Sequence, residues 1–149
     1  MFRLTFSAIE NNINLFSSSG SGGSFEASAT TTNGRINIKF PTAPVDSKLT
    51  FVGESRSGEA IISLNPAYEG TFKLQAGICI PRVDDYKLVR DPSGRNRKRV
   101  MLARAEELSR PSRKVVAGQV YWEDAVGQAK VTRGTVDVQT KSGKLVLAP

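Results

Sequence analysis

The most regular feature of this chain is a glycine followed by residues that alternate between apolar and polar. Residues 60–64 and 71–75 show the pattern clearly, because each run closely follows a glycine and the two runs flank a hinge at 65–70. Glycine accepts the positive φ of a tight turn, and apolar residues at every second position fill one face of a pleated strand. The pattern therefore predicts short strands joined by glycine-containing turns, and it begins again at Gly34, Gly118, Gly134 and Gly143.

The amino-terminal part has a different organisation. Residues 2–6 and 13–16 are two apolar runs around Asn11-Asn12, which predicts a β-hairpin segment over residues 1–16. Residues 17–24, SSSGSGGS, are low in complexity and are expected to form a flexible linker. Such linkers occur both in natural loops and in fusion proteins, so residues 1–16 are either native or grafted to the all-β domain of residues 25–149.

Turn signals divide the rest of the chain. Asn33-Gly34 is the strongest hairpin signal, and Ser57-Gly58 and Ser142-Gly143 are turns of the same kind. The run from residue 100 to 108 fits a strand through Leu102 and one helical turn after it. Together these signals predict an all-β fold of about nine to eleven stacked short strands, β-solenoid-like or sandwich-like, with glycine-punctuated turns.

Composition excludes several kinds of chemistry. The 149-residue chain has the length of a single domain, contains no histidine and has one cysteine, Cys79. Ser-His-Asp and Cys-His catalysis and histidine-ligated zinc are therefore excluded, and we expect neither catalysis nor a cofactor or metal. Because Cys79 lies between two isoleucines, it is expected to be a buried small hydrophobe. No run approaches the ~20 apolar residues of a membrane span, and we expect an intracellular protein, or a secreted one whose signal has been removed.

Positive charge is concentrated in one stretch. The net charge of the chain is +7, and residues 81–114 hold eleven Lys/Arg against five Asp/Glu. The run Arg-Asn-Arg-Lys-Arg at 95–99 has three interpretations: a polyanion or nucleic-acid site, a nuclear-import signal, or a solvated edge strand whose charge discourages aggregation. The residues that would bind a polyanion are Arg95, Arg97, Lys98, Arg99 and Arg104.

Aromatic and acidic residues supply weaker candidates. Tyr68, Tyr121 and Trp122 are candidates for carbohydrate or peptide binding on a sheet face, although core packing is the favoured interpretation for Tyr68 and Trp122. Glu69, Glu123 and Asp124 are the carboxylates nearest aromatic residues, and paired carboxylates can hydrolyse glycosides, but core packing of those aromatic residues is the favoured interpretation. Asp84, Asp85 and Asp91 could bind a cation such as calcium, but the surrounding Lys and Arg are expected to pair with these carboxylates instead.

Several of these segments resemble a known family. The segments 65–72 (NPAYEGTF), 91–99 (DPSGRNRKR), 118–122 (GQVYW) and 134–140 (GTVDVQT) are similar to a family of uncharacterised proteins of basidiomycete fungi. That family is distantly similar to bacterial adhesin-like domains. The resemblance covers about residues 25–147 and implies a repetitive, solenoid-like β-sheet domain with no established activity. It carries over no catalytic residue.

The sequence thus favours a non-catalytic structural or binding module. It would act through sheet faces or edges, with another protein or a second copy of itself as partner, and strand addition at an exposed edge would allow self-assembly. The alternative is a protein that binds a polyanion through the basic segment 82–114.

Overall fold

The computed structural model describes residues 2–8, 23–40, 47–84, 89–106, 113–123 and 134–148. These residues form eleven strands and no helix, which confirms the predicted all-β class and the predicted number of strands. The strand predicted to stop near Leu102 instead continues, because β8 (Lys98–Glu106) pairs along its whole length with β9 (Lys114–Glu123). The helical turn predicted after Leu102 is therefore wrong.

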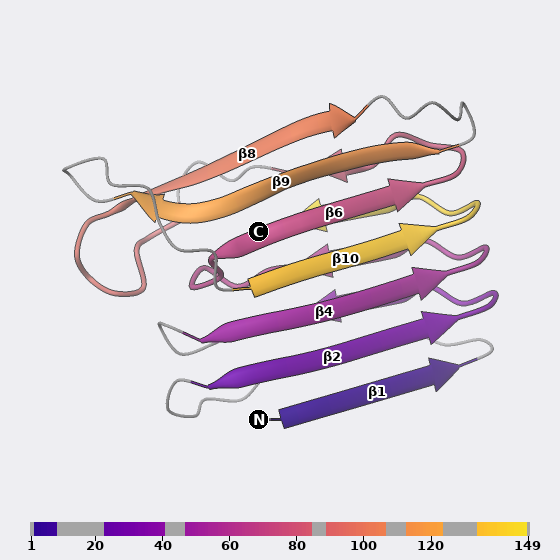
Figure 1. Ribbon diagram of the computed structural model, residues 1–149, viewed down its shortest axis with the longest axis horizontal. Coiled ribbons are helices and arrows are strands. Elements are labelled where there is room, and N and C mark those ends of the chain that lie inside the picture. Colours follow the sequence, from indigo (N-terminus) through magenta and orange to yellow (C-terminus); the bar gives the residue numbers. More distant parts are fainter. Residues whose placement is uncertain are drawn as a thin grey trace.

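The strands form two sheets (Figure 1). In the large sheet, β9 pairs antiparallel with both β6 and β8, and all the other pairs are parallel. The large sheet has the order β1 (Phe2–Ala8), β2 (Ser24–Thr31), β4 (Lys48–Ser55), β10 (Gly134–Thr140), β6 (Gly70–Ala76), β9, β8. The small sheet is parallel throughout and has the order β3 (Ile36–Lys39), β5 (Ala60–Ser63), β11 (Leu145–Ala148), β7 (Arg82–Val83).

From β2 to β8, consecutive strands lie in different sheets. β2 and β3 are joined by the Asn33-Gly34 turn, but β2 pairs with β1 and β4, whereas β3 pairs with β5. The predicted hairpin at this turn is therefore wrong, because a turn signal specifies local backbone geometry and leaves the pairing partner open. We call each strand–turn–strand segment a unit. The four units stack in the order β2–β3, β4–β5, β10–β11, β6–β7.

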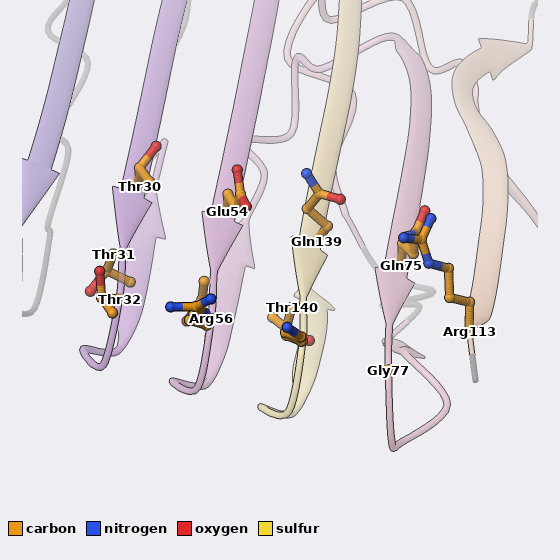
Figure 2. A pocket seen from close by; sticks show the side chains of 12 residues that line it. Thr30, Thr31, Thr32, Glu54, Arg56, Gln75, Gly77, Arg113, Gln139 and Thr140 are labelled. Atoms are coloured by element: carbon orange, nitrogen blue, oxygen red, sulfur yellow. The ribbon is translucent and has the colours of Figure 1, made fainter.

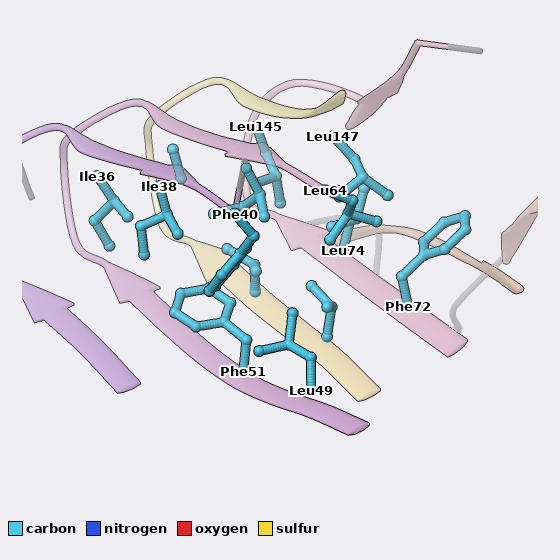
Figure 3. Close-up of a cluster of buried hydrophobic side chains, with 14 of the residues drawn as sticks. Ile36, Ile38, Phe40, Leu49, Phe51, Leu64, Phe72, Leu74, Leu145 and Leu147 are labelled. Carbon is cyan, nitrogen blue, oxygen red and sulfur yellow. The ribbon is translucent and has the colours of Figure 1, made fainter. Parts of the chain in front are cut away.

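Residues that alternate along each unit form the core between the sheets. β10 alternates strictly between buried and exposed residues, as the period-two pattern predicts. Figure 3 shows the inward side chains of several strands meeting in one cluster, with the Phe40 ring edge-on to Phe51 at 5.9 Å between centroids. The stack of units therefore buries a continuous apolar layer.

The hinge at residues 65–70 connects β5 to β6 and is held firmly. The Trp122 ring is buried, and its Nε1 donates a hydrogen bond to the Pro66 carbonyl oxygen at 3.0 Å. The Tyr68 ring is also buried, and its hydroxyl donates to the Thr71 carbonyl oxygen at 2.7 Å. Core packing of these two aromatic residues is thus confirmed.

The structure also bears on the predictions for Cys79 and for the amino-terminal segment. Cys79 is exposed in the turn between β6 and β7, beside Ile78 and Ile80, which are 66% and 70% exposed. The expectation of a buried thiol is wrong because this segment is a turn, where alternation no longer selects a buried face. β1 pairs in parallel with β2, and the second half of the predicted 1–16 hairpin and most of the 17–24 linker lie outside the described residues.

Candidate anion-binding site

The turns of the β2–β3, β4–β5 and β10–β11 units share a sequence pattern, Ser/Thr-x-Asn/Ser-Gly, in which the first hydroxyl hydrogen-bonds to the backbone of the glycine. In the first, the Gly34 N–H donates to Thr31 Oγ1 at 2.9 Å. In the second, Ser55 Oγ accepts from the Gly58 N–H at 2.9 Å and donates to the Gly58 carbonyl oxygen at 3.0 Å. In the C-terminal unit, Thr140 Oγ1 donates to the Gly143 carbonyl oxygen at 2.8 Å. Each buried hydroxyl therefore satisfies backbone groups of its own turn.

Glycine ends the pattern because neighbouring turns approach very closely. A Cβ on Gly58 would collide with the Gly34 carbonyl oxygen, and a Cβ on Gly143 would collide with the Gly58 carbonyl oxygen. The Lys141 N–H also donates to the Ser55 carbonyl oxygen at 3.0 Å, so the turns continue the ladder of the sheet. The turns thus form a regular edge, which we call the turn edge.

The residue that follows each buried hydroxyl faces solvent on the turn edge. These residues are Thr32, Arg56 and Lys141, and all three are exposed. Because the Arg56 and Lys141 turns are hydrogen-bonded neighbours, their backbones lie about one strand spacing apart, roughly 5 Å. The repeated turn geometry therefore places two cations side by side.

These cations border a concave region of about 790 Å³ on the outer face of the large sheet (Figure 2). Its floor is a row of side chains in register across four strands, Thr30, Glu54, Gln139 and Gln75. Arg113, just before β9, points toward Gln75. Arg56, Lys141 and Arg113 are the cationic lining residues and Glu54 is the carboxylate, so the lining has a net positive charge.

The charges of this region are not neutralised by ion pairs within the described parts of the chain. The four ion pairs found there involve Arg35, Arg82 and Arg97 as cations and do not include Arg56, Arg113 or Lys141. Neighbouring like charges repel, and an anion placed between them relieves that repulsion. Hydroxyl and amide groups beside them add neutral donors and acceptors. The region can therefore hold an anionic group with polar neighbours.

Arg97, one of the five predicted polyanion-binding residues, lies in the interior. Its guanidinium donates to Glu69 at 3.2 Å and to Asp91 at 3.1 Å, and its Cζ lies 5.7 Å from the Trp122 ring centroid. Burial raises the pKa of Asp91, but hydrogen bonds from Arg97 and Ser93 outweigh it and hold that pKa well below its usual range. Pairing of Asp91 with a neighbouring cation is confirmed, and Arg97 contributes nothing to an exposed basic surface.

The other predicted site residues are spread over several elements. Arg95 is exposed in the loop before β8, and Lys98, Arg99 and Arg104 lie on β8, which is the last strand of the large sheet in the described chain. Tyr68 and Trp122 are buried, and Tyr121 is partly buried. The structure thus does not gather the predicted basic residues into one site, and their binding of a polyanion stays a prediction.

Sequence reasoning missed Arg56 and Lys141 because they are far apart in the chain. A signal was present, since both occupy the second position of the same turn pattern, in Ser-Arg-Ser-Gly and Thr-Lys-Ser-Gly. Stacking of equivalent turns is what brings such positions together.

Comparison of the chain with family models, curated proteins and solved structures gave no match. The resemblance to the fungal family therefore stays a prediction. Among the described residues, no group of three or more cysteine, aspartate or glutamate side chains is placed to bind a metal ion. The same residues include no helix with the length and apolar character needed to cross a bilayer.

Proposed function

We propose that this protein is a non-catalytic binding module that holds an acidic polysaccharide in the concave region at the turn edge. Arg56, Lys141 and Arg113 would bind its carboxylate or sulfate groups. Gln75 and Gln139 would bind its hydroxyl groups. The stacked units support a solenoid-like architecture for the module, in which equivalent turns present side chains at regular spacing. The observation that carries the proposal is the alignment along one concave, polar surface of three cations that form no ion pair with the described residues.

A polymer suits this surface better than a single small ion. The region is open and extends over several strands of the large sheet, so an extended chain can contact Arg56, Lys141 and Arg113 at once. Each exposed contact of this kind contributes only about 0.2–1 kcal/mol. Several contacts along one polymer add up to useful affinity, and the affinity falls as salt rises.

The lining favours a saccharide over a nucleic acid. Proteins that bind single-stranded nucleic acids stack bases on aromatic side chains, and none of the 12 residues that line the region is aromatic. Threonine hydroxyls and glutamine amides both donate and accept hydrogen bonds, which matches the hydroxyl groups of a sugar. The polar lining residues of this kind are Thr30, Thr32, Gln75 and Gln139.

The proposal is tested by titrating the protein with polygalacturonate oligosaccharides at several salt concentrations. We expect binding that weakens with salt, and about tenfold weaker binding for the double variant R56Q/K141Q, from the loss of two contacts of up to about 1 kcal/mol each. The matched control is K39Q/K48Q, which removes the same charge from two exposed lysines outside the concave region. Equal binding by the two double variants would overturn the proposal.

A second candidate is polyanion binding along β8. Lys98 and Arg104 are exposed on this strand, and a nucleic acid could follow the basic edge. The same charge also suits a solvated edge strand, because cations there oppose the addition of a further strand. The variant K98Q/R104Q separates the candidates: loss of binding to single-stranded DNA in this variant, with R56Q/K141Q unaffected, would favour β8.

A further inference from the structure

The C-terminal unit, β10–β11, lies in the middle of the stack, although it follows both neighbouring units in the sequence. β10 is hydrogen-bonded to β4 on one side and to β6 on the other, and β11 is likewise held between β5 and β7. Both neighbouring units come earlier in the sequence. The two neighbouring units therefore leave a gap that is one strand wide in each sheet, which we call the slot, and the C-terminal unit fills it (Figure 1).

The hinge between β5 and β6 spans the slot. This segment must bridge two strand spacings, roughly 10 Å, whereas a connection between adjacent units bridges one. The contacts that hold it come from its own side of the slot: Trp122 binds Pro66, Tyr68 binds Thr71, and Arg97 binds Glu69. These contacts fix the hinge on the β6 side of the slot, and Gly70 at its end also pairs with Gly134 of the C-terminal unit.

The slot fits the C-terminal unit closely at the start of β10 and at the turn after it. Gly134 enters beside the Tyr68 ring, where a Cβ would lie 2.9 Å from Cε2, and Gly143 meets the Gly58 backbone at the turn. The inward apolar side chains of β10 and β11 are almost completely buried, and they are Val136, Val138, Leu145 and Leu147. The slot thus recognises a defined strand–turn–strand segment through backbone pairing and complementary apolar side chains.

We infer that this unit is exchangeable, so that two copies of the protein associate by placing their C-terminal units in each other's slots. Residues 124–133 join the unit to β9 in the sequence. At up to ~3.3–3.6 Å per residue, those residues reach much farther than the roughly 10 Å between β9 and β10. Every contact inside the slot is the same for either copy's unit, so concentration decides between closed monomer and exchanged dimer.

A disulfide engineered between β4 and β10 shows which copy of the protein supplies the C-terminal unit. Val52 and Asp137 are partners in the register of β4 and β10, and both are exposed on the outer face. Their Cα atoms lie one strand spacing apart, within the range of a disulfide. The test protein is V52C/D137C/C79S, in which the native exposed thiol is removed. An intrachain bond marks a unit in its own slot, and an interchain bond marks exchange.

The protein is refolded from urea at micromolar and at near-millimolar concentration, oxidised, and separated on a non-reducing gel. A size-tagged copy is mixed in to identify heterodimers. We expect covalent dimer whose fraction rises with the concentration during refolding. The matched control, S28C/V52C/C79S, joins β2 to β4 outside the exchanged unit, and it should give only intrachain bonds.

Intrachain bonds at every concentration in V52C/D137C/C79S would overturn the inference. So would the absence of any bond in that variant when the control forms one, since the unit would then not lie beside β4. The experiment is independent of ligand binding, because it reads chain connectivity without a saccharide.

Discussion

Nη1 of Arg97 lies 3.2 Å from Oε1 of Glu69, and both side chains are buried, at 8% and 6% exposure. The pair joins the loop before β8 to the hinge between β5 and β6, across 28 positions of sequence. Asp91 completes the cluster at 3.1 Å from Arg97 Nη2. Arg97, which the sequence places in a basic run, is therefore a buried residue that holds two segments of the fold together.

Replacing Arg97 by methionine should destabilise the protein strongly. Two buried carboxylates, Glu69 and Asp91, would each lose this cation, and breaking such a cluster on one side costs about 3–5 kcal/mol. Urea unfolding followed by Trp122 fluorescence measures the change. The control is R95M, which removes an exposed arginine from the same loop and should cost less than about 0.5 kcal/mol. Equal stability of R97M and R95M would contradict the structural role.

Acid should weaken the fold through Asp91. Because hydrogen bonds hold its pKa below the ordinary value, its contribution is complete above about pH 4 and is lost as the pH falls through the lowered folded-state value. The free energy of unfolding should therefore decrease below about pH 4. In D91N that decrease should be smaller, although the variant starts from a lower stability at pH 7. Parallel pH profiles for the two proteins would show that Asp91 is not responsible.

Removing the buried hydroxyl of Ser55 should destabilise the protein more than removing an exposed hydroxyl of the same turn. Alanine at this position would leave both the N–H and the carbonyl oxygen of Gly58 without their partner, at a cost of about 1–3 kcal/mol for each unsatisfied buried group. Thermal unfolding of S55A and of S57A tests this, because Ser57 is exposed two residues later in the same turn. A smaller loss for S55A than for S57A would contradict the turn scheme.

Removing the carboxylate of the concave region should strengthen ligand binding. Glu54 lies on the floor among the three cations, so E54Q raises the local positive charge without changing the size of the side chain. A gain of up to about 1 kcal/mol, or roughly fivefold in affinity for polygalacturonate, is expected at low salt. E59Q removes a carboxylate that does not line the region, and it should leave the affinity unchanged. Weaker binding by E54Q would show that the ligand is not anionic.

The strands were predictable because each one carries its own pattern. The alternation after Gly134, with Val136 and Val138 inward, matches the observed burial, and so does the alternation of Ile36 and Ile38. The order of the strands was not predictable. Every unit has the same alternation of apolar and polar residues, so the alternation does not determine which unit lies between β4 and β6. That position depends on long-range contacts, such as the close approach of Gly134 to Tyr68.

The site was harder to predict than the strands for a related reason. A run such as 95–99 is visible in the sequence, yet burial beside Trp122 removes Arg97 from the surface. Arg56 and Lys141 look isolated in the sequence, and they become neighbours because their turns are stacked. Charge density along a chain therefore indicates a site only after the fold has decided which side chains share a surface.

Mapping the bound ligand by NMR tests the central claim most directly. Backbone amide shifts of the isotope-labelled protein are followed during titration with an acidic oligosaccharide. The account predicts that the largest changes fall on the turn edge and the adjacent sheet row, at Thr32, Arg56, Gln139 and Lys141. Changes confined to Lys98–Glu106 of β8, with the turn edge unmoved, would contradict it.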